Sequence, residues 1–548
     1  MGRLRGEVVE QFFRRAIENV TKHGDTDIFP FPIENHVFHD CISETIELLG
    51  ELHSDFPKWL TSYPPANEGA LAPVTYTGFR WATQLDPIWN LYFLAMVLSI
   101  AEKIESQRVP ISEECVFSYR YLWNEQDSTI FDTRQNWRTF METSLRKANQ
   151  HAFVVICDIS EFYPRLGHHR LENALAHLEL KSDVPRRIRE FLSNFSNTNS
   201  FGLPIGGPAA RILSELVLNQ IDQLLRLEQI PFCRFSDDFH IFAESMEDGF
   251  AKLLFLSAKL QGTQGLQLQR AKTRIMSSSE FIATSPIRVD DHDAPDQGSV
   301  EPSLADKARS LLRFSIRFDP YSPTASDDYE QLKNEIEKFD IIGLLHAELS
   351  KSRIHVALAK KIVSAIRYLD PMKRDQAVLS LMGNAELLYP IFASILTVIK
   401  QVYSELSEGT QIEIIERLLK LIQSGSHVLR VELILAYAVR VLAARPSPGV
   451  QETLVKLYND QTLSSLTRRD IILAMTRLGA WPWLSDKRNS FRPMSQSERR
   501  AFIIASYSLK DEGRHWRDHI RKELSPFESL VKKWAAEKVQ QGNWIVPL

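Results

Sequence analysis

Two short segments, each combining an apolar run with acid, constrain the fold of this chain most. Residues 153–158 read Phe-Val-Val-Ile-Cys-Asp, and residues 234–242 read Arg-Phe-Ser-Asp-Asp-Phe-His-Ile-Phe. Apolar runs of this length predict buried β-strands. If the two strands lie side by side, Asp158, Asp237 and Asp238 converge. Clustered carboxylates repel one another unless cations hold them together.

The chemistry of such a cluster predicts a magnesium site. Carboxylate oxygens without nitrogen or sulfur ligands suit Mg²⁺, and Mn²⁺ can substitute for it. Two such ions, about 3.5–4 Å apart, catalyse in-line phosphoryl transfer by activating the attacking hydroxyl and stabilising the leaving oxygen. We therefore expect two metal ions on these three acids.

Composition indicates a multidomain globular protein of a reducing compartment. A chain of 548 residues exceeds a single ordinary core. The net charge of −4 gives no global sign of nucleic-acid binding, so such binding requires a local basic groove. The four cysteines are far apart and fit neither a zinc site nor a disulfide framework, which predicts a cytoplasmic location. No signal peptide and no run of about 18 apolar residues is seen, so we expect no membrane association.

The pattern along the chain predicts an α+β first half and an all-α second half. We expect residues 1–300 to form one domain, with a mixed α/β part at about 150–290, and residues 301–548 to form the other. The polar, acidic stretch 290–299 is the linker candidate. Amphipathic helices are predicted at 354–369, 410–422, 428–442, 450–458, 468–478 and 498–509. Their spacing favours HEAT-like helical repeats, with a compact helical bundle as the alternative.

Two further segments accompany the acidic strands. Residues 202–208 form a Gly/Pro-rich loop, which runs directly into a predicted helix at about 208–224. Such a loop lets the backbone approach a ligand closely. Residues 265–273, Gly-Leu-Gln-Leu-Gln-Arg-Ala-Lys-Thr, place the cation Lys272 after the acid pair.

In this order, the segments resemble the fingers and palm of a reverse transcriptase over roughly residues 75–285. The strand ending at Asp158 is similar to motif A, loop 203–206 with its helix to motif B, segment 235–238 to motif C, and segment 265–273 to motif D. Segments 78–80 and 117–120 are similar to the parts of the fingers that contact the incoming triphosphate.

The resemblance implies a role for each matching catalytic residue. Asp158 and Asp237 would bridge both metals, Asp238 would be an auxiliary ligand, and Ile159 would lie at the metals and the nucleotide. Lys272 would neutralise the pyrophosphate leaving group or give it a proton.

It also implies nucleotide contacts. Tyr163 would exclude a ribose 2′-hydroxyl and so select deoxynucleotides. Pro204, Ile205 and Gly206 would touch the nucleotide, and Arg80 and Arg120 would clamp its triphosphate with their planar guanidinium groups. Structural alternatives stay open, because an Asp-Asp pair often only makes a turn, Tyr163 can be a core residue, and Arg80 can extend from the surface.

Two positions depart from the common family pattern. Ile205 replaces the glutamine that many templated enzymes carry in the motif B loop, which removes a polar contact to the incoming nucleotide. Phe235 replaces the usual tyrosine of motif C and keeps its ring. No ribonuclease H, endonuclease or maturase constellation is found in the second half.

The Leu-Pro-Ile-Gly loop and the helical second half together resemble the abortive-infection and defence-associated reverse transcriptases of bacteria. This resemblance implies antiphage defence, homo-oligomers formed through the helical domain, and dNTP polymerisation. The polymerisation is either untemplated and protein-primed or templated by a non-coding RNA. Candidate priming tyrosines are Tyr389, Tyr403, Tyr437 and Tyr507. The alternatives are a catalytically silent fold that binds RNA or serves assembly, and a nucleotide cyclase, which the motif B loop and helix disfavour.

Overall fold

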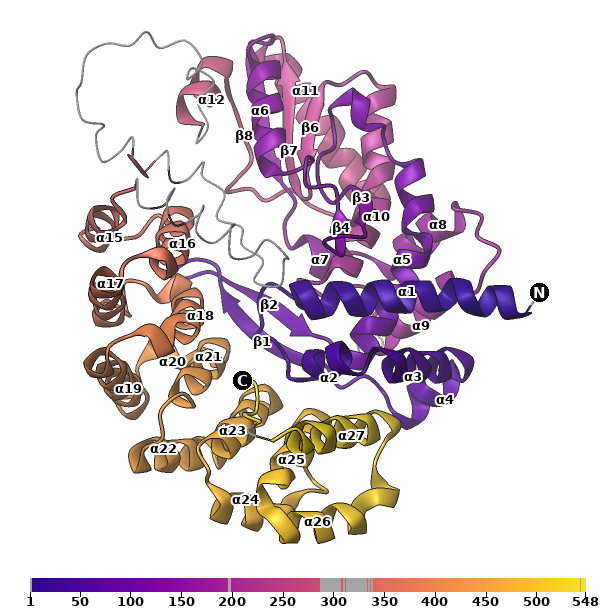
Figure 1. Ribbon diagram of the computed structural model, residues 1–548. Helices are drawn as coiled ribbons and strands as arrows, with labels where there is room; N and C mark the ends of the chain where they lie inside the picture. The colour runs from indigo at the N-terminus through magenta and orange to yellow at the C-terminus, as the bar shows by residue number, and fades with distance from the viewer. Residues whose placement is uncertain are drawn as a thin grey trace. The chain divides into compact units, whose positions relative to one another are not determined.

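An antiparallel sheet of four strands, in the order β6-β7-β5-β8, organises the region that carries the acidic segments (Figure 1). The strands are β5 (Phe153–Asp158), β6 (Phe232–Phe235), β7 (Asp238–Ala243) and β8 (Arg274–Ser277). β5 pairs with β7 on one side and with β8 on the other, both antiparallel. The two acidic segments are therefore neighbours in the sheet, as their sequences predict.

Helices cover both faces of this sheet, which explains why β5 is apolar up to its last residue, Asp158. Val154 belongs to a buried cluster with Phe140 of α6 (Trp137–Ala148) and Phe281 of α12 (Ser278–Thr284). The next residue, Val155, faces Gly249 of α11 (Met246–Lys259). A strand buried on both faces reads as a continuous apolar run rather than an alternation.

The computed structural model describes residues 2–195, 199–285, 307–308, 311, 333, 336, 339–542 and 544–548. These residues divide into two compact units. Unit 1 contains residues 1–27, 38–67 and 83–297, and unit 2 contains residues 28–37, 68–82 and 298–548. Two stretches from the first hundred residues thus belong to the unit that holds the C-terminal helices. The linker candidate at 290–299 lies outside the described residues.

Two long helices form the core of unit 1 beside the sheet. α5 (Pro87–Gln107) and α10 (Pro208–Leu227) contact each other, and each has a proline in its first turn, where no amide partner is lost. Among described helices, α5 alone is long and apolar enough to span a membrane, but 83% of that window is buried, as in a core helix. The other helices of unit 1 are α1 (Gly2–His23), α3 (Ile42–Ser54), α4 (Phe56–Ser62), α7 (Phe162–Arg165), α8 (His168–Ala176) and α9 (Val184–Phe195).

Two small hairpins and one short helix complete the N-terminal part of the chain. β3 (Tyr121–Asn124) pairs with β4 (Thr129–Phe131), and β1 (Glu68–Pro73) pairs with β2 (Phe79–Gln84). Helix α2 spans Glu34–Asp40. Both α2 and β2 include residues of each unit.

The helices of unit 2 follow one another along the chain and form two series, in each of which a helix contacts the next member. The contacts run from α16 to α18, α21, α23, α25 and α27, and a second series joins α15, α17, α19 and α22. The helices are α15 (Ile341–Leu349), α16 (Val356–Ala365), α17 (Pro371–Gly383), α18 (Phe392–Val402), α19 (Glu408–Gln423), α20 (His427–Arg430), α21 (Glu432–Leu442), α22 (Pro448–Tyr458), α23 (Ser465–Arg477), α24 (Trp481–Lys487), α25 (Gln496–Ala505), α26 (Lys510–His519) and α27 (Pro526–Gln540). For the residues described from 339 onward, this confirms the predicted all-α second half, with two series of contacting helices as in helical repeats.

Buried ion pairs attach the early stretches of unit 2 to its late helices. Arg500 of α25 pairs with Glu34 at 2.6 Å, and both side chains are buried. Arg440 of α21 donates to the carbonyl of Phe31 at 2.8 Å and pairs with the buried Asp470 of α23 at 2.6 Å. Removing one member of such a pair leaves a charge unpaired in the interior, so these contacts specify how the early and late segments join.

Candidate active site

Strands β5 and β7 place two of the predicted acids opposite each other. In their antiparallel register, Asp158 is the partner of Asp238. Directly opposed residues have Cβ atoms about 4.5–5.5 Å apart, so these carboxylates are close neighbours. Asp237 joins them through the backbone, because the amide of Ile159 donates to the Asp237 carbonyl at 3.1 Å. The structure therefore brings all three acids and Ile159 together at one end of the sheet.

Charge and burial shift the pKa values of these acids. Burial, followed by the charges of Asp237 and Asp158, raises the pKa of Asp238 to about 7. Burial and the charge of Asp158 also raise the pKa of Asp237. Ionised carboxylates in this arrangement are poorly solvated and repel one another, and a bound cation would relieve both penalties.

Lys272 supplies one positive charge to the cluster. Its Nζ lies 2.5 Å from Oδ2 of Asp158, although 63% of the side chain is exposed. The backbone reinforces the contact, because the Gln269 amide donates to the Asp158 carbonyl at 2.7 Å and the Lys272 amide donates to the Gln269 carbonyl at 3.1 Å. Partial burial lowers the pKa of Lys272, but the hydrogen bond and charge of Asp158 outweigh it and raise the pKa overall.

The donor set suits a hard divalent cation, although the side chains are not arranged as a closed cage. Asp158, Asp237 and Asp238 offer oxygen ligands of the kind that Mg²⁺ prefers. Across the described residues, no group of three or more His, Cys, Asp or Glu side chains already has metal-binding geometry. In this conformation Oδ2 of Asp158 is bound to Lys272, so a metal that uses this oxygen would have to displace the lysine.

The turn that carries Asp237 is tight and conformationally unfavourable. Phe235 pairs with Asp238 across the β6–β7 hairpin, which leaves only Ser236 and Asp237 to form the turn. Ser236 has φ of +56°, in the left-handed region that residues with a Cβ disfavour. The Ser236 carbonyl accepts a hydrogen bond of 2.8 Å from Nη1 of Arg234, which holds the turn in place.

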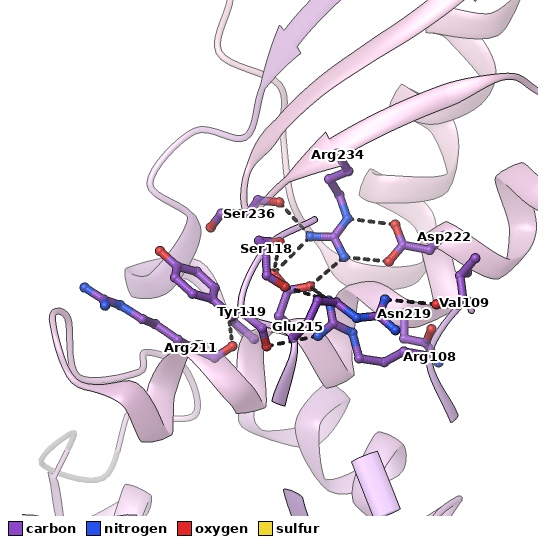
Figure 2. A network of polar contacts seen from close by, with 12 residues as sticks. Arg108, Val109, Ser118, Tyr119, Arg211, Glu215, Asn219, Asp222, Arg234 and Ser236 are labelled. Atoms are coloured by element: carbon purple, nitrogen blue, oxygen red, sulfur yellow. Dashed lines mark hydrogen bonds and ion pairs between the residues drawn. The ribbon is translucent and has the colours of Figure 1, made fainter. Parts of the chain in front are cut away.

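A buried network of charges surrounds Arg234 (Figure 2). Its guanidinium binds Asp222 at 2.5 and 2.7 Å and Glu215 at 2.8 and 3.1 Å. Glu215 also accepts from Nη2 of Arg108 at 2.5 Å and from the Ser118 hydroxyl at 2.6 Å. Burial would raise the pKa of Glu215, but Arg234 and Arg108 lower it overall. Two cations and two anions thus neutralise one another beneath the acidic turn.

This network is the main feature that sequence reasoning missed. The available signal is Arg234 itself, which lies in a strand of otherwise apolar residues. A charge in a buried strand requires partners. Glu215 and Asp222 are seven residues apart and lie on one face of the preceding helix, α10, which matches that requirement.

The motif B loop packs against the segment that holds Tyr163. The Leu203 amide donates to the Tyr163 carbonyl at 3.0 Å, and the Gly202 amide donates to the Leu166 carbonyl at 2.8 Å. The Tyr163 hydroxyl is buried and makes no hydrogen bond of standard geometry, although Ser214 and Ser236 lie near it. Burial raises the pKa of Tyr163, so the phenol stays neutral.

The three loop residues differ in exposure and conformation. Pro204 is buried, whereas Ile205 and Gly206 are half-buried. Gly206 has φ of +111°, and a Cβ built there would lie 2.3 Å from Oγ1 of Thr26. Glycine is thus required at this position both by the backbone conformation and by the close approach of Thr26.

Arg80 and Arg120, the two predicted triphosphate contacts, have different surroundings. Arg80 is exposed on the part of β2 that belongs to unit 2. Arg120 is buried in unit 1, where Nη2 pairs with Glu105 at 2.5 Å and Nη1 donates to the Val109 carbonyl at 2.9 Å. The guanidinium of Arg120 thus already has buried partners in this conformation, and its contact with a triphosphate stays a prediction.

Another arginine lies nearer the acidic turn. Arg211, in the first turn of α10, has its guanidinium 5.2 Å from the ring centre of Tyr119 and 3.0 Å from Asp27. The Tyr119 ring lies 6.0 Å from that of Phe235. Burial raises the pKa of Tyr119, and the charge of Asp237 adds to this effect. Arg211 is thus a cation beside Tyr119, whose pKa the charge of Asp237 affects, and sequence reasoning did not select it.

Comparison with known proteins identifies the domain. Residues 105–301 match the family model described as reverse transcriptase (RNA-dependent DNA polymerase). No curated protein sequence matches the chain. The family match confirms the predicted reverse transcriptase domain and with it the enzyme class, an RNA-directed DNA polymerase or nucleotidyltransferase.

Solved structures of telomerase show a weak likeness. The complex of Candida albicans telomerase with a fragment of telomeric RNA is 12% identical, with a TM-score of 0.29 over 71% of this chain and 70% of that chain. Apo telomerase from Candida tropicalis is 11% identical, with a TM-score of 0.27 over 76% and 73% of the two chains. Scores this low carry no weight for the function of this chain.

Proposed function

We propose that this chain, which carries a reverse transcriptase domain over residues 105–301, joins deoxynucleotides by metal-assisted phosphoryl transfer. The observation that carries the proposal is the convergence of Asp158 and Asp238 in one strand register, with Asp237 in the adjoining turn and Lys272 on Asp158. An oxygen-rich acidic cluster beside a partly exposed cation suits a reaction in which a phosphate group is attacked and a pyrophosphate leaves.

Asp158, Asp237 and Asp238, with the backbone at Ile159, would hold the divalent ions, two Mg²⁺ or their Mn²⁺ substitutes. The ions would neutralise charge on the reacting phosphate and lower the pKa of the attacking hydroxyl. Lys272, released from Asp158, would then be free to contact the leaving group. Its raised pKa keeps it protonated, as a proton donor or a counter-charge must be.

Nucleotide selection would fall to the residues around Tyr163. The Leu203 amide binds the backbone carbonyl of Tyr163 and so holds the segment that carries the ring, which would lie under the sugar. Pro204, Ile205 and Gly206 would contact the nucleotide from the same loop. Arg211 is a better candidate than Arg120 for a phosphate contact, because its guanidinium is partly exposed and lies near the acidic turn.

Nucleotide incorporation by the purified chain tests this proposal. The chain is incubated with Mg²⁺ and each labelled dNTP, with and without RNA, beside Asp237→Ala, Asp238→Ala and the control Asp248→Ala. Asp248 is an acid of α11 that pairs with Lys252 at 2.7 Å. We expect incorporation that Asp237→Ala abolishes and Asp248→Ala preserves. No incorporation of any nucleotide, or equal incorporation by all variants, would contradict the proposal.

We further propose a role in bacterial antiphage defence, with assembly as homo-oligomers in the cytoplasm. This rests on the Leu-Pro-Ile-Gly loop and on the series of contacting helices in unit 2, an arrangement from which repeat proteins build binding surfaces. The alternative is a catalytically silent fold that binds RNA or serves assembly. Phage protection that survives the double change Asp237→Ala and Asp238→Ala would favour this alternative.

The tyrosine hydroxyls bear on protein priming. Tyr403, Tyr437 and Tyr507 donate to the backbone carbonyls of Gln411, Ile28 and Lys532 at 3.2, 3.2 and 2.8 Å. Each would have to break this bond before its oxygen could attack a nucleotide. Sequencing the nucleic acid that copurifies with the chain separates the two modes, since a complement of a small RNA indicates templating and a repeat attached to protein indicates protein priming.

A further inference from the structure

Helix α11 has an exposed side that is almost free of charge. Its inner side packs closely on the sheet, where Gly249 and Leu256 are buried and a Cβ at Gly249 would lie 3.4 Å from Val155 of β5. The exposed residues of the helix are Met246, Glu247, Phe250, Ala251, Leu254 and Ala258. Glu247 is the only charged residue among them, whereas the solvent side of a surface helix is ordinarily charged and polar.

Three large apolar side chains form a row on this exposed side. Met246, Phe250 and Leu254 are 46%, 61% and 61% exposed, and they follow one another every four residues, which places them along one face. Among the helical side chains that the structure describes, α11 alone has more than one large apolar residue this exposed. Isolated apolar residues are common on protein surfaces, but a contiguous row marks an interaction surface.

We propose that this row joins two copies of the chain, with α11 of one copy packed antiparallel on α11 of the other. A two-fold contact uses one surface twice, so that surface has to be complementary to itself. A two-fold axis level with Lys252 places Phe250 of one copy opposite Leu254 of the other, and Met246 opposite Ala258. Large side chains thus meet small ones at both ends of the contact. Parallel helices would instead place each large side chain opposite its own copy.

The charges of α11 favour the same orientation. Glu247 lies in the first turn and Lys259 in the last turn, and neither makes an ion pair within the described residues. The Lys259 ammonium lies 5.2 Å from the ring centre of Phe255, on the flank of the exposed side. In the antiparallel pair, Glu247 of each copy is displaced by only two residues, about 3 Å along the axis, from the level of Lys259 of the other. The helix dipoles also oppose each other in this orientation.

The size of the surface predicts a weak dimer. Stable interfaces bury about 800 Å² on each partner, which is more than one face of a single helix of this length supplies. We therefore expect a dissociation constant of about 10 µM. The contact is formed by unit 1, whereas the sequence assigns assembly to the helical domain. It does not depend on the proposed polymerase activity.

Equilibrium sedimentation of the full-length chain, without nucleotide or metal, tests this surface. Between about 1 and 100 µM, the average mass of the parent should rise towards that of a dimer. Phe250→Asp and Leu254→Asp should each weaken association at least about tenfold, because an exposed position tolerates the change in the monomer but a carboxylate cannot be buried in the contact.

Two controls separate this result from others. Met372→Asp replaces an apolar residue of α17 that is 84% exposed, and it should associate as the parent does. Asp237→Ala should also associate normally, so a failure of the polymerase proposal leaves this one untouched. A parent that stays monomeric throughout, or association that Phe250→Asp and Leu254→Asp leave unchanged, would overturn the proposal.

Charge exchange and cross-linking test the orientation. Glu247→Lys and Lys259→Glu should each weaken the dimer about fivefold, and the double variant should recover most of the loss, since the pairs form again with their signs exchanged. With a short bismaleimide, Ala251→Cys should cross-link to its own copy, because the two positions are about 3 Å apart along the axis. Glu247→Cys is the matched control and should not, because its two copies are about 15 Å apart along the axis. Equal cross-linking by both cysteine variants, or no recovery in the double charge variant, would overturn the antiparallel contact.

Discussion

Arg234 holds the carbonyl of Ser236 at 2.8 Å and so fixes the turn between Phe235 and Asp238. The same guanidinium is fully buried and neutralises Glu215 and Asp222. One arginine therefore supports both the fold beneath the acidic turn and the position of Asp237. This dual role leads to the first prediction.

Replacing Arg234 with methionine should destabilise the chain by about 3–5 kcal/mol, because it leaves two buried carboxylates short of a partner. Arg234→Lys keeps the charge but cannot reproduce four hydrogen bonds and the contact to Ser236, so it should retain more stability than methionine and still lose nucleotide incorporation. Thermal unfolding and incorporation are measured together. The control is Arg226→Lys, whose partner Glu113 is at the surface and half-exposed. Equal incorporation by the two lysine variants would contradict a positioning role.

Asp238 makes stability depend on pH. Its folded pKa of about 7 lies above the ordinary value of 3.8, so the folded chain binds this proton more tightly than the unfolded chain does. The contribution to stability is complete below pH 4 and is lost as the pH rises through 7. Asp238→Asn should therefore be more stable than the parent by about 2 kcal/mol at pH 8, and similar to it at pH 4.

Melting temperatures of the parent and of Asp238→Asn across this pH range measure the effect. At pH 8, millimolar Mg²⁺ should raise the melting temperature of the parent more than it raises the melting temperature of Asp238→Asn. Asp248→Asn is a control of opposite sign, because the hydrogen bond from Lys252 lowers the pKa of Asp248. A parent chain whose melting temperature does not change between pH 5 and pH 8 relative to Asp238→Asn would refute the prediction.

Two adjacent glycines in the motif B loop should respond differently to alanine. Gly206 has φ of +111° and a Cβ there would meet Thr26, whereas Gly207 has φ of −84° and its nearest atom is the Asp25 carbonyl at 3.5 Å. Gly206→Ala should cost about 1–3 kcal/mol, and Gly207→Ala less than about 1 kcal/mol. Adding Thr26→Ala to Gly206→Ala should restore only the steric part, since the backbone cost remains. Unfolding of the three variants and the parent decides between the two causes.

Lys272→Ala should lower incorporation by about 10²-fold, as expected when a proton donor or counter-charge for the leaving group is removed. The exposed neighbour Arg270→Ala is the matched control, since it removes a cation from the same segment without touching Asp158. Single-turnover rates with saturating dNTP isolate the chemical step. A loss confined to KM, or an equal loss for both variants, would indicate general attraction of phosphate rather than action at the leaving group.

Much of the fold around the acids could be predicted from the sequence, because patterns within short segments specify its strands and helices. The apolar run before Asp158 and the short hairpin around Asp237 each specify a strand, and the order of the parts indicates a sheet that brings the acids together. The amphipathic periods after residue 354 likewise predicted the helices of unit 2. In both cases the order of apolar and polar residues within one short segment is enough to predict the element.

Features that depend on distant partners could not be predicted in this way. Arg120 has the sequence context of a phosphate-binding arginine, but Glu105 and the Val109 carbonyl occupy it in the fold. Arg211 gained its place near the acids because Tyr119 and Asp27 hold it there. A single sequence indicates which side chains carry charge, whereas the tertiary fold decides which charges are already paired.

The pairing of Glu34 with Arg500 gives the chain a long assembly path. Ribosomal synthesis delivers the acid 466 residues before its base, so unit 2 can close only once the C-terminal helices have emerged. A fragment that starts at residue 341 would retain Arg440 and Arg500 but lose Phe31 and Glu34, and would expose cationic sites meant for burial. The C-terminal helices are therefore needed to bury Glu34. Removing either the N-terminal segment or the last helices should break the same pairing between Glu34 and Arg500.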